Sequence, residues 1–244
     1  MKRIIITGAS GSIGSEIVKY FYKKNDLICI DIDKKNLKIL KNKYKKIKTY
    51  QCDLTSKKKV DQLMSQLNTK YKHFDILINN AGKIYSNPII KLSSKGLKSH
   101  SYTDWKKILD VNLNSIFLFS SSIIENFCKN RTKGIIINIS SISAKGNKGQ
   151  SAYSVAKSGV EILTKVWAQE LSSFNIRVAC IAPGFFNTKS TIRSLSSFQI
   201  DHLKKNTPLK RMGSTKELIQ AINFVIKNKF FNGKVLSLDG GLEI

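Results

Sequence analysis

Tyr153 and Lys157 stand four residues apart, and in a helix this spacing places both side chains on one face. A phenol with an ordinary pKa of about 10 is a poor proton donor and acceptor at neutral pH. A neighbouring ammonium group favours the phenolate and lowers that pKa. Ser141 ends the apolar run that precedes this segment, where its hydroxyl could polarise a carbonyl beside the phenol. The three residues predict proton transfer at a carbonyl or alcohol.

A glycine-rich segment, Thr7-Gly8-Ala9-Ser10-Gly11-Ser12-Ile13-Gly14, lies between an apolar run and a predicted helix. Glycines in such a turn let the backbone approach a pyrophosphate, and the helix N-terminus supplies free N–H donors. Asp31 follows Gly14 by 17 residues, where a carboxylate can accept hydrogen bonds from a ribose 2′-hydroxyl and repel a 2′-phosphate. These residues predict a dinucleotide site with NAD preferred over NADP, although Lys34 and Lys35 could offset part of that repulsion.

Short apolar runs alternate with helix-length segments along the whole chain, and several of the runs are continuously apolar, as in strands buried on both faces of a parallel sheet. This alternation predicts an α/β fold: one doubly wound, parallel, seven-stranded sheet with helices on both faces, in a single domain over residues 1–244. The expected strands are Arg3–Thr7, Leu27–Asp31, Thr49–Asp53, Phe74–Asn79, Gly134–Ser140, Ile176–Ala182 and Lys234–Leu238. The expected helices include Ile13–Lys24, Lys57–Tyr71, Thr103–Lys129, Ala152–Leu171 and Thr215–Lys227, the last with Thr215 as its N-cap.

Two polar segments interrupt this alternation, residues 83–102 and 185–207. Each follows the carboxyl end of a predicted strand, which is where doubly wound folds bind their ligands. Long loops at such places are often lids or binding loops. We therefore expect both to be loops that contact the substrate.

The composition excludes several classes of protein. Of 244 residues, 41% are hydrophobic and 24% charged, which is typical of a globular chain and not of a disordered one. No apolar run approaches the roughly 18 residues of a membrane-spanning helix, and the Met1-Lys2-Arg3 start leads directly into a short strand-like run, so we expect no signal peptide, no membrane association and a cytoplasmic location. The four cysteines and three histidines have no metal-ligand spacing, so no metal site is predicted.

The net charge is unusual, because 42 Lys and Arg residues against 16 Asp and Glu give +26. Almost all of the excess positive charge comes from lysines spread along the chain. Proteins that bind nucleic acid usually use arginine and interleaved aromatic residues. We therefore expect no nucleic-acid partner. Two interpretations stay open: a compositional drift, or a preference for an acidic carrier or a phosphorylated ligand.

The order of these motifs resembles that of the short-chain dehydrogenase/reductase family, in its compact branch of about 250 residues, over essentially the whole chain. The resemblance rests on Thr7–Gly14, Asn79-Asn80-Ala81-Gly82, Asn112, Ser141, Tyr153, Lys157, Pro183-Gly184 and Asp239-Gly240-Gly241. It implies a Rossmann fold and a catalytic set in which Tyr153 is the acid/base, Lys157 lowers its pKa and holds the nicotinamide ribose, Ser141 orients the substrate oxygen and Asn112 anchors a water of the proton relay. It assigns cofactor contacts to Gly8, Ser10, Gly11, Ser12, Ile13, Gly14, Asp31, Asp53, Leu54, Asn79, Ala81, Gly82, Tyr153, Lys157, Pro183, Gly184, Phe186 and Thr188.

The glycine segment departs from the pattern of the compact branch. Compact members usually carry TGxxxGxG, whereas this chain has TGxxGxxG, the spacing of the extended branch, with Ser12 at the usual place of the middle glycine. The departure affects the details of phosphate contact and leaves dinucleotide binding as the prediction.

The resemblance implies an NAD(P)-dependent oxidoreductase that interconverts a secondary alcohol and a ketone. Within the family the chain is similar to 3-oxoacyl-carrier-protein reductases and to short-chain 3-hydroxyacyl-CoA dehydrogenases, which implies an acyl-thioester substrate. Two alternatives remain: a reductase of a sugar or polysaccharide-pathway ketone, and a dinucleotide-binding sensor or scaffold without turnover. The family also forms homotetramers through the helices expected at Thr103–Lys129 and Ala152–Leu171, which here carry apolar residues on more than one face.

Overall fold

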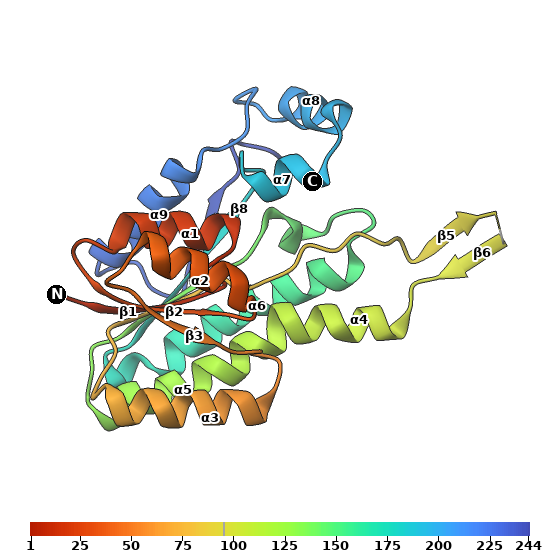
Figure 1. Ribbon diagram of the computed structural model, residues 1–244. Helices are drawn as coiled ribbons and strands as arrows, with labels where there is room; N and C mark the ends of the chain where they lie inside the picture. The colour runs from red at the N-terminus through yellow and green to blue at the C-terminus, as the bar shows by residue number, and fades with distance from the viewer. Residues whose placement is uncertain (95) are drawn as a thin grey trace.

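The computed structural model describes residues 1–94 and 96–244, and within them the chain forms an α/β fold around a seven-stranded parallel sheet (Figure 1). The strand order is β3-β2-β1-β4-β7-β8-β9. The strands are β1 (Arg3–Thr7), β2 (Asp26–Asp31), β3 (Lys48–Gln51), β4 (Ile76–Asn79), β7 (Ile135–Ile139), β8 (Arg177–Pro183) and β9 (Val235–Leu238). The helices are α1 (Ser12–Phe21), α2 (Lys34–Lys43), α3 (Lys57–Lys70), α4 (Tyr102–Leu109), α5 (Ser115–Lys129), α6 (Ser151–Glu170), α7 (Lys189–Ser194), α8 (Ser197–Asn206) and α9 (Thr215–Lys227).

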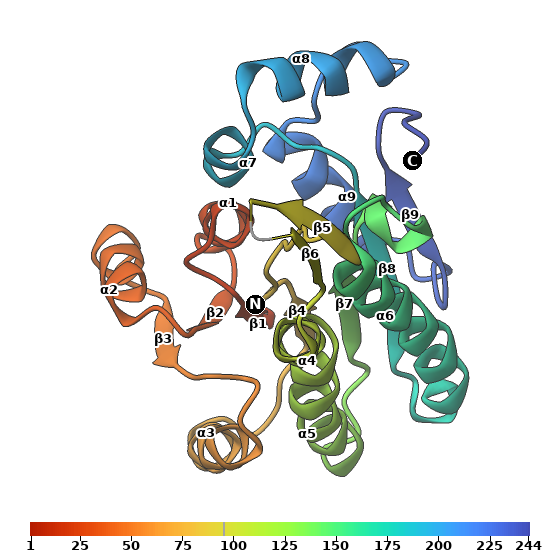
Figure 2. The same cartoon turned by 90° about the vertical axis from the view of Figure 1, so that its right-hand side faces the viewer.

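Helices cover both faces of the sheet, as Figure 2 shows when the sheet is viewed from the carboxyl ends of its strands. One buried cluster joins α1, α2 and α9 to one face, and a second joins α3, α5 and α6 to the other. Alternate residues of a strand pack into the clusters on opposite faces of the sheet. In β1, Ile4 and Ile6 belong to the first cluster and Ile5 to the second. The continuous apolar runs therefore indicate burial on both faces, and all seven predicted strands are confirmed.

Helix α2 was not among the elements expected from the sequence. Its segment is rich in lysine, and only Leu37 and Leu40 are buried, so its apolar stripe is too narrow to stand out. The helix begins because the Asp33 side chain accepts a hydrogen bond from the Asn36 backbone N–H, which caps it. A similar correction applies to α9, whose N-cap is Ser214 in a capping box with Glu217, and not Thr215.

The two segments expected to be loops contain regular structure. Within residues 83–102, β5 (Ile90–Ser93) and β6 (Gly96–Ser99) pair as an antiparallel hairpin that stands out from the body of the molecule (Figure 1), while Lys95 of that segment lies outside the described residues. Within residues 185–207, α7 and α8 follow one another. The sequence did not predict either feature, because the strand residues of the hairpin are exposed and α8 has no buried residue, so neither has an apolar pattern facing a core.

A continuous helix runs from Tyr102 to Lys129, long and apolar enough by length and composition to cross a bilayer. It comprises α4, one π-helical turn (Asp110–Asn114) and α5. Phe119, Ile123 and Phe127 are fully buried in the cluster that covers the sheet. One face of this helix thus packs into the core, and 39% of its most apolar 18-residue stretch is buried.

Candidate active site

Two loops meet at the carboxyl edge of the sheet, where the strand order reverses between β1 and β4. The Thr7 hydroxyl accepts hydrogen bonds from the backbone N–H groups of Asn80 and Ala81, each at 3.0 Å. The Asn80 side chain donates back to the carbonyls of Thr7 and Gly8, at 3.0 and 3.1 Å. These bonds clamp the glycine turn against residues 79–82. Thr7 and Asn80 were not among the predicted site residues. Both belong to the two sequence motifs quoted above, and this membership was the feature of the sequence that could have identified them.

Two positions in the glycine turn accept only glycine. Gly8 has φ +61°, and a Cβ there would lie 2.8 Å from Ala81 Cα. A Cβ on Gly14 would lie 2.1 Å from the Gly8 carbonyl oxygen. The turn therefore packs directly on the start of α1 and on the loop after β4.

Asp31 ends β2 beside this turn. Its Oδ2 accepts a hydrogen bond from the Ser10 backbone N–H at 2.9 Å, and its Oδ1 accepts one from Asp33 N–H at 3.1 Å. The two bonds hold the carboxylate at the end of the strand next to the glycine turn, which is the arrangement that the spacing predicted.

The remaining predicted cofactor residues surround the same edge. Asp53 follows β3, and a hydrogen bond from the Thr55 hydroxyl at 2.7 Å lowers the pKa of its carboxyl. Thr188 caps α7, and its hydroxyl accepts a hydrogen bond from Thr191 N–H at 3.2 Å. Leu54, Phe186, Pro183 and Gly184 line the ends of β3 and β8, and Phe186 is buried against Gly213.

The side chain of Asn79 points into the core. Its Nδ2 donates to Ser120 Oγ at 2.8 Å and to Asn138 Oδ1 at 2.9 Å, and the Asn138 amide continues to Thr164 Oγ1 at 2.9 Å. Asn79 is 1% exposed. Its amide thus belongs to a buried hydrogen-bond network beneath the site, and this network joins β4 and β7 to α5 and α6.

Tyr153 and Lys157 lie on the first two turns of α6, four residues apart on one face as their spacing predicted, and both side chains are buried. The Lys157 ammonium lies 5.8 Å from the centroid of the Tyr153 ring and donates to the Ile139 carbonyl at 2.8 Å. Burial lowers the pKa of Lys157 to about 8. Burial also raises the pKa of Tyr153, and a hydrogen bond with Ser141 acts in the opposite direction. The main influence on the phenol in this structure is thus burial, whereas the sequence suggested Lys157.

Asn112 and Lys157 both lie close to Gly82, in the loop that follows β4. A Cβ on Gly82 would lie 2.8 Å from Asn112 Oδ1 and 3.5 Å from Lys157 Nζ. Asn112 lies in the π-helical turn, fully buried, and its side chain bonds both the N–H and the carbonyl of Lys83 at 3.0 Å. π-Helical turns occur frequently at functional sites. The loop that follows β4 therefore contacts Asn112 and Lys157, and Lys157 lies one helix turn from Tyr153, which bonds Ser141.

The glycine turn fits an anionic group. The N-cap of helix α1 is Gly11, which has no side chain to cap it, and the first turn of α1 has no acidic residue, so its leading N–H groups are open to a phosphate. A cavity of about 400 Å³ adjoins it, lined among others by Ser10, Ser12, Asn36 and Thr188. Within the described part of the chain there is no group of three or more His, Cys, Asp or Glu side chains that could hold a metal ion. The residues present therefore fit a dinucleotide.

Comparison with known proteins agrees with this arrangement. The sequence model of the family described as short chain dehydrogenase matches residues 2–197. The chain belongs to the short-chain dehydrogenase family and is an oxidoreductase of that family.

The chain is similar to two proteins named 3-oxoacyl-[acyl-carrier-protein] reductase FabG. The one from Thermotoga maritima is 32% identical, over 100% of this chain and 98% of the relative, and the one from Buchnera aphidicola subsp. Baizongia pistaciae is 36% identical, over 99% and 97%. Among solved structures, a 4-hydroxyisoleucine dehydrogenase complexed with NADH has a TM-score of 0.89 and 31% identity, covering 99% of this chain and 98% of that one. These likenesses support binding of a nicotinamide dinucleotide.

Proposed function

We propose that the protein interconverts a secondary alcohol and a ketone with NAD(H), and that its substrate is a 3-oxoacyl or 3-hydroxyacyl thioester. The observation that carries the reaction type is the meeting of buried Tyr153, buried Lys157 and Ser141 next to the loop after β4, which packs on the glycine turn. The full-length similarity to the two FabG reductases supports the substrate class.

In this proposal Tyr153 gives a proton to the substrate oxygen during reduction and takes it back during oxidation. Ser141 holds the same oxygen, and its hydrogen bond with Tyr153 favours the phenolate. Lys157 binds the ribose and supplies positive charge beside the phenol, and Asn112 holds a water through which the proton is replaced. The nicotinamide, when bound, supplies or accepts the hydride.

The cofactor would be held at three places. The N–H groups at the start of α1 bind the pyrophosphate, Asp31 binds the adenine ribose, and Thr188 holds the carboxamide. Asp53, Leu54, Ala81 and Phe186 complete the contacts along the sheet edge, whereas Asn79, whose side chain is buried and bonded to Ser120 and Asn138, supports this edge from beneath.

The two segments expected to contact the substrate, residues 83–102 and 185–207, lie at the carboxyl ends of the sheet strands (Figure 2). In the β5–β6 hairpin, the register pairs Leu92 with Leu97 and Lys91 with Lys98, so one face is apolar and the other basic. The apolar face suits an acyl chain, and the basic face suits the anionic phosphopantetheine group that carries the chain. The net charge of +26 supports the same substrate class.

A substrate screen with NADH and NADPH tests the proposal. It compares acetoacetyl thioesters of CoA and of acyl carrier protein with keto-sugars and with a 4-oxo amino acid. We expect the highest kcat/KM for a thioester. A keto-sugar turned over efficiently, with thioesters inert, would instead establish the alternative substrate class.

Cofactor preference is predicted from Asp31. Two negative groups about 4 Å apart repel by a few kcal/mol at an effective dielectric near 20, so NADP(H) is disfavoured. We expect a preference for NAD(H) of about tenfold or more in kcat/KM, or roughly 1.4 kcal/mol. Asp31→Ala should reduce the preference mainly by improving NADP(H) use. A wild-type enzyme that prefers NADPH would show either that Asp31 does not face the 2′ position or that Lys34 or Lys35 binds the phosphate.

We further predict a homotetramer. On α5 and α6, Phe119 and Trp167 are buried, whereas Phe117, Ile162 and Val166 are 51%, 54% and 41% exposed. The two helices lie side by side on the outer face of the molecule (Figure 2), so these exposed groups provide an apolar surface for a second copy.

Light scattering at micromolar concentration should give the mass of a tetramer. Phe117→Glu combined with Ile162→Glu should lower that mass, because charge would be buried in the contact. Phe230→Glu is the control, since Phe230 is 99% exposed elsewhere on the surface. A wild-type monomer would refute the prediction.

A further inference from the structure

Helix α6 carries a row of polar residues that continues past the candidate catalytic pair. Tyr153, Lys157, Glu161, Lys165 and Gln169 follow one another at intervals of four residues. Side chains at this interval lie one above the other, and the row turns slowly around the helix. Tyr153 and Lys157 are buried, Glu161 is partly buried and the last two are exposed. The row thus runs from the buried candidate catalytic pair to solvent-exposed positions further along α6.

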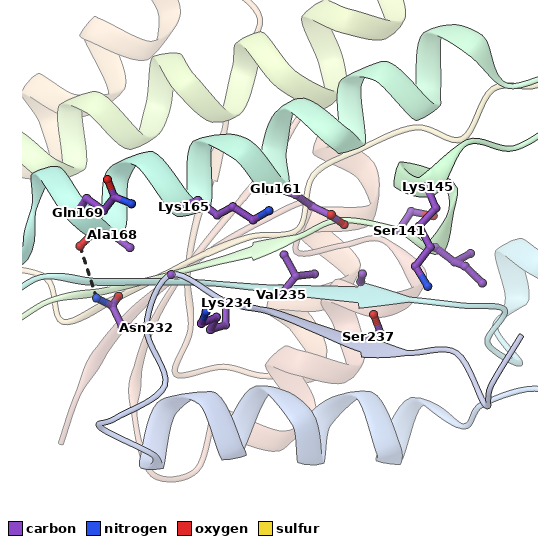
Figure 3. A pocket seen from close by; sticks show the side chains of 13 residues that line it. Ser141, Lys145, Glu161, Lys165, Ala168, Gln169, Asn232, Lys234, Val235 and Ser237 are labelled. Carbon is purple, nitrogen blue, oxygen red and sulfur yellow. Dashed lines mark hydrogen bonds between the residues drawn. The ribbon is translucent and has the colours of Figure 1, made fainter. Parts of the chain in front are cut away.

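Glu161 and Lys165 extend from α6 into a groove beside β9, and Ser141 and Lys145 lie at the groove's other end (Figure 3). The groove has a volume of about 740 Å³. Most of the side chains that line it are polar, among them Lys234, Asn232 and Ser237. The groove therefore reaches the candidate catalytic serine, Ser141.

Ser140 links Glu161 to the site. Its Oγ lies 2.9 Å from Glu161 Oε1 and 3.2 Å from the Lys157 carbonyl oxygen. A hydroxyl has one proton to donate, and the carboxylate is both the nearer and the stronger acceptor. The Ser140 backbone is held separately, because its N–H donates to the Ile181 carbonyl at 2.8 Å. Glu161 thus fixes the side chain of the residue directly before Ser141.

Burial raises the pKa of the Glu161 carboxyl above its ordinary value, and the Ser140 hydroxyl and the ammonium groups of Lys165 and Lys145 oppose that rise without cancelling it.

We propose that Glu161 is a positioning residue, whose carboxylate holds the Ser140 hydroxyl and thereby aligns Ser141 with Tyr153. The inference rests on the proposed function, since Ser141 and Tyr153 are the acting groups in it. Small displacements of an aligned group cost much of a rate, because the reacting atoms must lie within a narrow range of distances. Loss of the Ser141 hydrogen bond would also raise the pKa of Tyr153, because that bond favours the phenolate.

The first test measures Tyr153 without any substrate. The tyrosinate absorbance of each protein is titrated with pH, and the curve of its Tyr153→Phe counterpart is subtracted. Glu161→Ala should move the Tyr153 midpoint to higher pH. Glu161→Gln should leave it near the wild-type position, because the amide oxygen still accepts from Ser140. Glu170→Ala is the matched control, an exposed acid at the end of the same helix.

The second test measures turnover. Glu161→Ala should lower kcat about tenfold with little change in the KM for the dinucleotide, and Glu161→Gln should restore most of it. Ser140→Ala should have a similar effect, and the double variant Ser140→Ala with Glu161→Ala should be no worse than either single one.

The outcomes separate the two proposals. An unmoved Tyr153 midpoint in Glu161→Ala, or equal effects of Glu161→Ala and Glu161→Gln, would overturn the positioning role while Tyr153→Phe still tests the function. Full turnover by Tyr153→Phe would overturn the function itself. If Glu161→Ala does not fold, the midpoint in Ser140→Ala decides the question.

Discussion

Tyr153→Phe is expected to abolish turnover while dinucleotide affinity stays within a few-fold of wild type. In the proposed function the phenolic proton acts in the transition state, and general acid–base groups contribute about 10²–10⁴-fold to rates. The ring itself packs against Ile108 and Ala152, and phenylalanine keeps that packing. Steady-state kinetics and a fluorescence titration of NADH would measure the two quantities.

Two results would contradict this assignment. Residual activity within tenfold of wild type would show that another group transfers the proton. A loss of dinucleotide affinity equal to the loss of kcat would show that Tyr153 acts in binding. Ser154→Ala, on the same helix turn, serves as a control for damage to α6.

Lys157→Met is expected to lose both activity and dinucleotide affinity, because in the proposed function the ammonium group both supports the Tyr153 phenolate and binds the ribose. Methionine keeps much of the buried length and removes the charge. Lys157 is 4% exposed, so its charge is poorly screened by water. Calorimetric titration with NAD and a kcat measurement should both show large losses. Unchanged affinity would contradict the double role.

The same variant has a pH signature in the free enzyme. Lys157 titrates at about 8 in the folded protein and at the ordinary 10.5 when unfolded. Between these pH values the unfolded chain binds one more proton, so raising the pH stabilises the folded state. The free energy of unfolding of wild type relative to Lys157→Met should therefore rise by up to about 3 kcal/mol across this window and be flat below it. Urea unfolding at several pH values would measure it, and a relative stability that falls across the window would show that burial does not lower this pKa.

The elements that the sequence predicted well are those whose signal is local. The seven strands have apolar runs that arise from burial on both faces, and the spacing of Tyr153 and Lys157 depends only on the helical period. The elements it missed have no such signal. Helix α2 buries two leucines, α8 buries no residue, and the β5–β6 hairpin is exposed on every strand residue.

The amino-acid sequence alone therefore determined the strands, the glycine turn and the register of Tyr153 with Lys157, because each follows from neighbours in the chain. Only the tertiary structure decided which distant groups meet. Thr7 clamps Asn80, 73 residues further on, and Ser140 bonds Glu161 across 21 residues. Such pairs depend on strand order and on how α6 lies over β7, which are set by burial of the whole sheet between its two layers of helices.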